Sequence, residues 1–270
     1  TWTRVLASKS TLFWGVHGQL YHFAPSDLKP SPNNPINRRQ TQGAQGALGN
    51  AFVGLTREFT DKLSGELGLR QGIYAQLGEG KVYQYPGNAP NPDVDPSDSL
   101  FYGPAEMMQR YQGLEPRIAL RYMLRPDFSL KVSYNRNFQY VQIASNSSAG
   151  LPIDRWVLAD QYIRPIQSDQ FSVGVFHNFD QNRWELSVEG YYKDLQHVID
   201  LRNGARILLS DQVETELLSG RGWAYGAEFL FRKNKGKTTG WLGYTWSRAW
   251  RQIDGISRNE AYNPRFDRPH

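Results

Sequence analysis

Cysteine is absent from all 270 residues of the chain. Disulfide bridges, thiolate metal ligands and cysteine nucleophiles are therefore excluded. The chain also has no run of about 20 apolar residues, the length that a membrane-spanning helix requires. Its mean hydropathy of −0.61 is that of a polar chain. Helical insertion into a membrane is excluded as well.

The usual signatures of catalysis and metal binding are equally missing. No Gly-x-Ser-x-Gly elbow, phosphate-cradling loop or dinucleotide fingerprint occurs. Glu185 and Glu189 would lie about 13 Å apart on one strand, too far for a glycosidase carboxylate pair. Three carboxylates within residues 91–98 lack the glycine and distal glutamate of an EF-hand, so a solvated loop is favoured over a calcium site. The histidines have no metal-ligand spacing: His17, His22, His177, His197 and His270.

We therefore expect no enzyme activity, no metal site and no cofactor. Nucleic-acid binding is also disfavoured, because the net charge of +5 is spread along the chain and phosphate neutralisation needs a dense basic stripe. The aromatic share of 13% comes mostly from Tyr and Trp. Their apolar bodies and polar tips suit a boundary between water and an apolar phase.

Alternation of apolar and polar residues is the dominant local pattern. Between Trp184 and Tyr192 every second residue is apolar or glycine, and Glu185 and Glu189 share the opposite face. A period of two predicts β-strands with one apolar face. The same period recurs in three further segments, residues 116–124, 128–138 and 223–231.

Aromatic residues stand at the two ends of these apolar faces. They lie eight to ten residues apart in the pairs Trp184 and Tyr192, Phe128 and Phe138, and Trp223 and Phe231. That separation spans roughly 20–25 Å on a tilted strand, which is the height of the apolar band between the aromatic girdles of a membrane barrel. A soluble sandwich would also alternate, so the position of the aromatic residues is the discriminating feature.

Short and long connections alternate between the predicted strands. Short turns lie near residues 8–10, 60–62, 125–127, 180–182 and 234–237, and long segments rich in Pro, Asn and Gly cover 23–42, 76–113, 140–167, 197–220 and 251–265. Membrane barrels have short periplasmic turns and long extracellular loops. The rhythm predicts about eleven antiparallel strands, near residues 1–7, 11–22, 43–59, 63–75, 114–124, 128–139, 168–179, 183–195, 222–233, 238–250 and from 266.

The fold class is thus all-β, an antiparallel transmembrane β-barrel. An odd number of strands cannot close a bacterial single-chain barrel. We therefore expect residues 1–270 to be part of a single barrel domain whose terminal strands and plug are missing from this sequence.

Particular strings resemble TonB-dependent outer-membrane receptors, chiefly between residues 114 and 270. The strings are WELSVEGYYKD at 184–194, GRGWAYGAE at 220–228, GWLGYTWS at 240–247 and YNPRFDRPH at 262–270. The loop at 140–167 resembles the subgroup that carries a carboxypeptidase-regulatory-like domain ahead of its plug.

The resemblance implies a barrel of about 22 strands with a plug in its lumen, in the outer membrane of a Gram-negative bacterium. Outer-membrane lipid surrounds such a barrel, and a missing N-terminal region engages the TonB complex. External loops bind a nutrient, such as a small molecule, peptide or oligosaccharide, and TonB drives import without covalent chemistry. In sugar and peptide importers of the family a surface lipoprotein lid can cover the vestibule, but nothing in this sequence requires one.

Two groups of residues are candidates for contact with a ligand or a plug. Loop aromatics could capture a ligand by stacking or could pack the loops together: Tyr83, Tyr85, Phe101, Tyr102, Trp156 and Tyr162. Charges on the polar strand faces are expected to line the lumen, where pairing with a plug or with each other is favoured over substrate passage: Arg117, Arg121, Lys131, Glu185, Glu189 and Glu228.

Two alternative functions share much of this pattern. A passive porin or an envelope-assembly barrel would have the same girdles and rhythm but no plug. A soluble carbohydrate-binding β-sandwich would bury its apolar faces against each other instead of exposing them to lipid. The leading interpretation is TonB-dependent import across the outer membrane.

Overall fold

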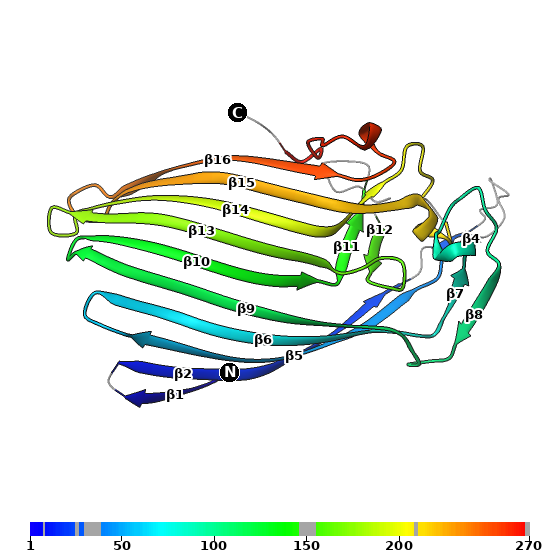
Figure 1. Ribbon diagram of the computed structural model, residues 1–270, viewed down its shortest axis with the longest axis horizontal. Helices are drawn as coiled ribbons and strands as arrows, with labels where there is room; N and C mark the ends of the chain where they lie inside the picture. Colours follow the sequence, from blue (N-terminus) through cyan, green and yellow to red (C-terminus); the bar gives the residue numbers. More distant parts are fainter. Residues whose placement is uncertain (8, 25–26, 30–38, 146–154, 208–209, 268–270) are drawn as a thin grey trace.

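The computed structural model of the chain describes residues 1–7, 9–24, 27–29, 39–145, 155–207 and 210–267. Ten long strands in this part form one antiparallel sheet, in which each strand pairs with the next long strand along the chain (Figure 1). They are β1 (Trp2–Ala7), β2 (Ser10–Phe23), β5 (Ala44–Glu58), β6 (Leu63–Leu77), β9 (Met107–Arg125), β10 (Phe128–Gln139), β13 (Ile166–Phe179), β14 (Trp184–Leu201), β15 (Leu217–Lys233) and β16 (Gly240–Gln252).

The two ends of this sheet differ in their connections. At the turn end, residues 59–62, 126–127, 180–183 and 234–239 join neighbouring strands. At the loop end lie three short hairpins and two 3₁₀ turns, at the right in Figure 1. These are β3 (Asp27–Leu28) with β4 (Arg39–Gln40), β7 (Gly80–Gln84) with β8 (Asp98–Tyr102), β11 (Val141–Ala144) with β12 (Arg155–Leu158), η1 (Pro86–Asn88) and η2 (Val213–Glu216); a third 3₁₀ turn, η3 (Ser257–Asn259), follows β16.

The antiparallel β-architecture predicted from the alternation is confirmed, with β1 and β16 as the edges of an open wall. The eleventh strand, predicted from residue 266, is not seen at Phe266 or Asp267, because this segment turns instead. Residues 268–270, where that strand would continue, lie outside the described residues.

Several predicted loops turned out to be strand. β14 runs on to Leu201, β9 begins at Met107 and β15 begins at Leu217, all within segments expected to be loop. Beyond the apolar band both faces of a strand contact water or folded loops, so the alternation fades. Backbone pairing still continues there, because it does not depend on side-chain polarity.

One face of the sheet is apolar and is not covered by any described part of the chain. Val175, Val188, Phe229 and Tyr244 are successive cross-strand partners on β13 to β16. Phe229 keeps 37% of its surface exposed and Tyr244 keeps 53%. Within the described residues the apolar face therefore meets no second sheet, whereas the two sheets of a soluble sandwich pack face to face.

The opposite face of the sheet is polar. Arg121, Lys131, Gly174, Glu189 and Glu228 form one cross-strand row on β9 to β15. The row lies between the positions of the apolar row, because side chains alternate along every strand. A water-filled or plugged lumen suits such a face.

Aromatic rings gather at the turn end as predicted. The rings of Trp184 and Phe231 stack with centroids 5.1 Å apart, and Phe179 stacks on both. Phe138 differs from the expectation, because β10 is no longer paired with β9 beyond Asn135 and the Phe138 ring packs against the buried cluster around Tyr74.

No helix in the described part of the chain is long and apolar enough to cross a membrane.

A pair of arginine substitutions tests the two faces. Phe229→Arg should destabilise the barrel by about 2–4 kcal/mol, because it places a charge near the middle of the lipid-facing band. Glu228→Arg, one residue away on the polar face, should change stability by less than about 1 kcal/mol. Guanidinium unfolding in phospholipid vesicles, followed by tryptophan fluorescence, measures both. Equal losses for the two variants would contradict the assignment of faces.

Candidate functional site

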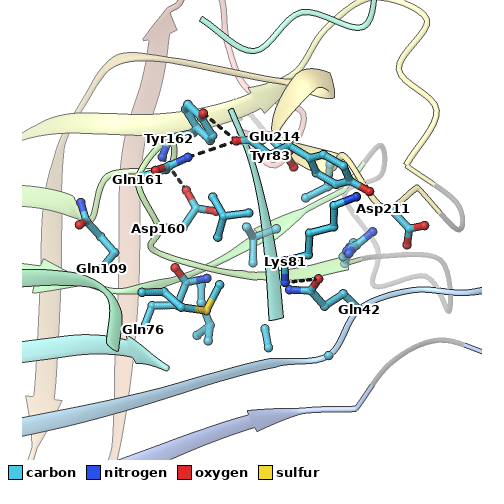
Figure 2. Close-up of a pocket in the computed structure, with 18 of the residues that line it drawn as sticks. Gln42, Gln76, Lys81, Tyr83, Gln109, Asp160, Gln161, Tyr162, Asp211 and Glu214 are labelled. Atoms are coloured by element: carbon cyan, nitrogen blue, oxygen red, sulfur yellow. Dashed lines mark hydrogen bonds between the residues drawn. The ribbon is translucent and has the colours of Figure 1, made fainter. Parts of the chain in front are cut away.

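The connections at the loop end enclose a pocket of about 100 Å³ (Figure 2). Gln42 follows β4, and Lys81 and Tyr83 lie on β7. Gln76 on β6 and Gln109 on β9 also line the pocket, and most of the remaining wall comes from β12, the segment after it and η2. Drug-sized ligands occupy roughly 300–1,000 Å³. A pocket of this volume therefore suits one functional group or one part of a larger ligand.

A turn centred on Asp160 forms part of the pocket wall. The Asp160 carboxylate accepts the backbone N–H groups of Tyr162 and Ile163, each at 2.7 Å, and the Asp160 N–H donates to the Ile163 carbonyl. The Tyr111 hydroxyl donates to the Asp160 carbonyl at 2.7 Å. The preceding Ala159 is buried in the cluster beneath. These bonds hold the turn in one conformation against the sheet.

Tyrosine side chains join this turn to the β7–β8 hairpin and to η2. The Tyr162 hydroxyl donates to the Tyr83 carbonyl at 2.9 Å, and the Gln161 amide donates to the same oxygen at 3.3 Å. The Tyr85 hydroxyl donates to the Glu214 carboxylate at 2.9 Å, and the Tyr85 and Tyr162 rings meet edge to face. The β7–β8 loop, the Asp160 turn and η2 therefore form one packed unit.

Burial dominates the electrostatics of the pocket. It raises the pKa of Asp160 to about 7, although the two backbone N–H bonds favour the charged form. Burial also raises the pKa of Glu214 and lowers the pKa of Arg155. Near neutral pH the Asp160 carboxyl can therefore donate or accept a hydrogen bond.

Three of the six predicted ligand-facing aromatics line the pocket, namely Tyr83, Trp156 and Tyr162. Trp156 stacks on Phe23 with ring centroids 6.0 Å apart and still exposes 52% of its surface. A flat, half-exposed indole supported from behind is well placed to stack against a ligand.

The other three predicted aromatics lie elsewhere. Tyr85 is buried and does not line the pocket, and its hydroxyl donates to Glu214, which does. Phe101 and Tyr102 lie on β8 and are not part of the wall, and Phe101 exposes 76% of its surface. Their roles as ligand contacts remain predictions, as do those of the three aromatics in the wall.

The polar wall residues were not singled out in the sequence. They come from connections far apart along the chain and carry no shared motif, so only the folded loops bring them together. They are Gln42, Gln76, Lys81, Gln109, Arg155, Asp160, Gln161, Asp211 and Glu214.

The basic residues predicted to line the lumen lie on the polar face of β9 and β10. Arg117 donates to the Asn137 side chain at 3.1 Å, and Arg121 donates to the Ser129 hydroxyl at 3.2 Å. The Lys131 ammonium lies 4.1 Å from the centre of a phenylalanine ring on β13. Arg121 and Lys131 are direct cross-strand neighbours, and both line a groove of about 340 Å³.

The predicted acidic residues occupy the same face on β14 and β15. Glu185 pairs with Arg232 at 3.5 Å. Glu189 and Glu228 face each other directly across two strands and form no ion pair with a described residue. Like charges in this position repel each other. The polar face thus carries charges of both signs, and Glu189 lines the same groove as Arg121 and Lys131.

Among the described residues, no three His, Asp or Glu side chains are grouped so that they could hold a metal ion.

A family model and several solved structures resemble this chain. The family model for the β-barrel of TonB-dependent receptor-like proteins matches residues 2–267. The FrpB iron transporter of Neisseria meningitidis has a TM-score of 0.61 and 10% identity over 98% of this chain and 37% of that chain. The ferric yersiniabactin uptake receptor FyuA of Yersinia pestis has a TM-score of 0.56 and 12% identity over 93% and 34% of the two chains.

The copper transporter OprC has a TM-score of 0.55 and 14% identity over 96% of this chain and 38% of that chain. The chain therefore spans little more than a third of the length of these structures. At such identities the likeness concerns the fold alone. No curated protein matches the sequence.

The Asp160 turn should lose stability as pH rises towards and through 7. The pKa of the Asp160 carboxyl is about 7 in the folded protein, and its ordinary value, which applies to the unfolded chain, is 3.8. The stabilisation is therefore complete below about pH 4 and is lost as pH rises through the folded pKa. Hydrogen exchange of residues 159–165, corrected for its intrinsic pH dependence, should lose protection by at least about tenfold between pH 4 and 8. The variant Asp160→Asn should keep the same exchange protection at both pH values. If the variant loses protection between pH 4 and 8 as the wild type does, Asp160 is not the cause.

Proposed function

The chain belongs to the TonB-dependent receptor family, and from its β-barrel match over residues 2–267 we propose that the protein imports a nutrient ligand across the outer membrane of a Gram-negative bacterium. This family consists of outer-membrane transporters rather than enzymes. The observation that carries the proposal is the opposition of the two faces of the sheet. An uncovered apolar face and a charged opposite face suit a wall between lipid and lumen.

In this proposal the pocket at the loop end contacts the ligand first. Trp156 offers a stacking surface, and Asp160 and Glu214 offer hydrogen-bonding groups held in place by the packed loops. Binding to prepared groups loses less entropy than binding to mobile loops. The pocket would hold only part of a ligand, so other loops or a plug would complete the site.

Neighbouring like charges on the polar face support a lumen that holds a plug. Arg121 and Lys131 are cross-strand neighbours, as are Glu189 and Glu228, and like charges in such pairs repel each other. Polar and charged groups of a plug that approach these two pairs would reduce both repulsions. TonB would engage the N-terminal region of such a protein and displace the plug to open a passage.

Uptake by cells that express the full-length protein tests the proposal. A panel of labelled ferric chelates, cobalamin, oligopeptides and oligosaccharides is offered with TonB present, with TonB deleted, and with a protonophore. We expect saturable uptake of at least one member that is lost in both energy-deprived conditions. Uptake that rises linearly with concentration and does not require TonB would instead identify a passive pore.

Trp156→Ala should weaken binding of the imported ligand roughly tenfold, since a stacking contact contributes on the order of 1–3 kcal/mol. Phe101→Ala is the matched control, because Phe101 is an exposed loop aromatic outside the pocket wall. Equilibrium binding to cells at 4 °C measures both variants. The assignment of the pocket fails if Phe101→Ala has the larger effect.

A further inference from the structure

A second groove lies at the turn end of β14, β15 and β16, far from the loop pocket. Its volume is about 270 Å³. Trp184, Phe231 and Leu242 supply apolar side chains, while Lys233 and the threonines at 238 and 239 supply polar ones. Neither the function proposed above nor the sequence analysis uses this groove.

The floor of the groove is apolar and open. Trp184 and Phe231 stack 5.1 Å apart with their planes at 15° to each other. Leu242 is the cross-strand partner of Phe231 and exposes 65% of its surface. The floor continues without a break into the apolar face, because Leu186 is the partner of Phe231 on β14.

The rim of the groove is cationic. The Lys233 ammonium lies 5.3 Å from the centre of the Trp184 ring and forms no salt bridge with a carboxylate among the described residues. The adjacent Arg232 does pair with Glu185, but on the polar face of the sheet. Lys233 is therefore an uncompensated positive charge beside the hydroxyls of Thr238 and Thr239.

These features together select an amphiphile with a negative head. Ammonium and hydroxyl groups donate to phosphate oxygens, and the aromatic floor gains from burial of apolar carbons. We propose that the groove binds one anionic glycerophospholipid. Its phosphodiester contacts Lys233 and the Thr238 and Thr239 hydroxyls, and its glycerol and first acyl carbons cover Trp184 and Phe231.

The site rests on the membrane placement in the proposed function, with the turn end at the headgroup level. Cations also lie over rings elsewhere at this end, for example Arg125 at 5.7 Å from the Phe128 ring. Arg125, however, has Asp127 at 3.6 Å and does not border this groove. Arg125 is therefore a matched control, because Asp127 compensates its charge.

Native mass spectrometry of the full-length protein in detergent, titrated with phosphatidylglycerol, tests the site. Wild type should retain one lipid molecule more tightly than any others. Lys233→Gln and the double change Thr238→Val with Thr239→Val should each raise the apparent Kd at least fivefold, whereas Lys233→Arg and Arg125→Gln should leave it within twofold. Thermal unfolding of each variant confirms that it is folded.

Inorganic phosphate serves as a second probe, since it could use the rim but not the floor. Millimolar phosphate should not displace the lipid. The proposal is overturned if Lys233→Gln retains the lipid as well as wild type, or if phosphate competes fully. Lipid retention is measured on purified protein, and import is measured as uptake by cells. Loss of the lipid site alone would therefore leave the proposed import function standing, and absence of uptake would leave the lipid measurement valid.

Discussion

Backbone hydrogen bonds between neighbouring strands are the interaction on which the rest of this chain depends. In hydrocarbon a strand has no water partner, so each N–H and C=O must be satisfied by an adjacent strand. The ten strands pair in chain order, and this pairing fixes their register. Register in turn fixes which residues share a face, so that Phe229 joins Val188 and Tyr244 while Glu228 joins Glu189.

The turn end and the loop end of the sheet differ in structure. At the turn end, short connections keep the strands in register and leave aromatic rings and cations at one level. At the loop end, strands such as β14 extend past the apolar band and carry folded hairpins. The Asp160 turn packs on this extended part. A rigid wall thereby holds this turn in one position, which a free loop would not.

The strands were predictable because a period of two survives in the sequence wherever one face is apolar, as between Trp184 and Tyr192. The extension of β14 to Leu201 was not, since alternation fades where loops cover both faces. Trp156 could be named as a loop aromatic. Asp160 could not, because its importance comes from burial and from two backbone N–H groups, which leave no local signal in the sequence.

The central claim is that the apolar face meets lipid and the polar face meets a water-filled or plugged lumen. Because the chain contains no cysteine, single cysteines at positions 226–231 can each carry a nitroxide label in the membrane-embedded protein. Accessibility to oxygen should peak at 227, 229 and 231, with a period of two, and accessibility to a water-soluble nickel chelate should stay low there. High nickel accessibility at 229, or no alternation between 228 and 229, would contradict the account.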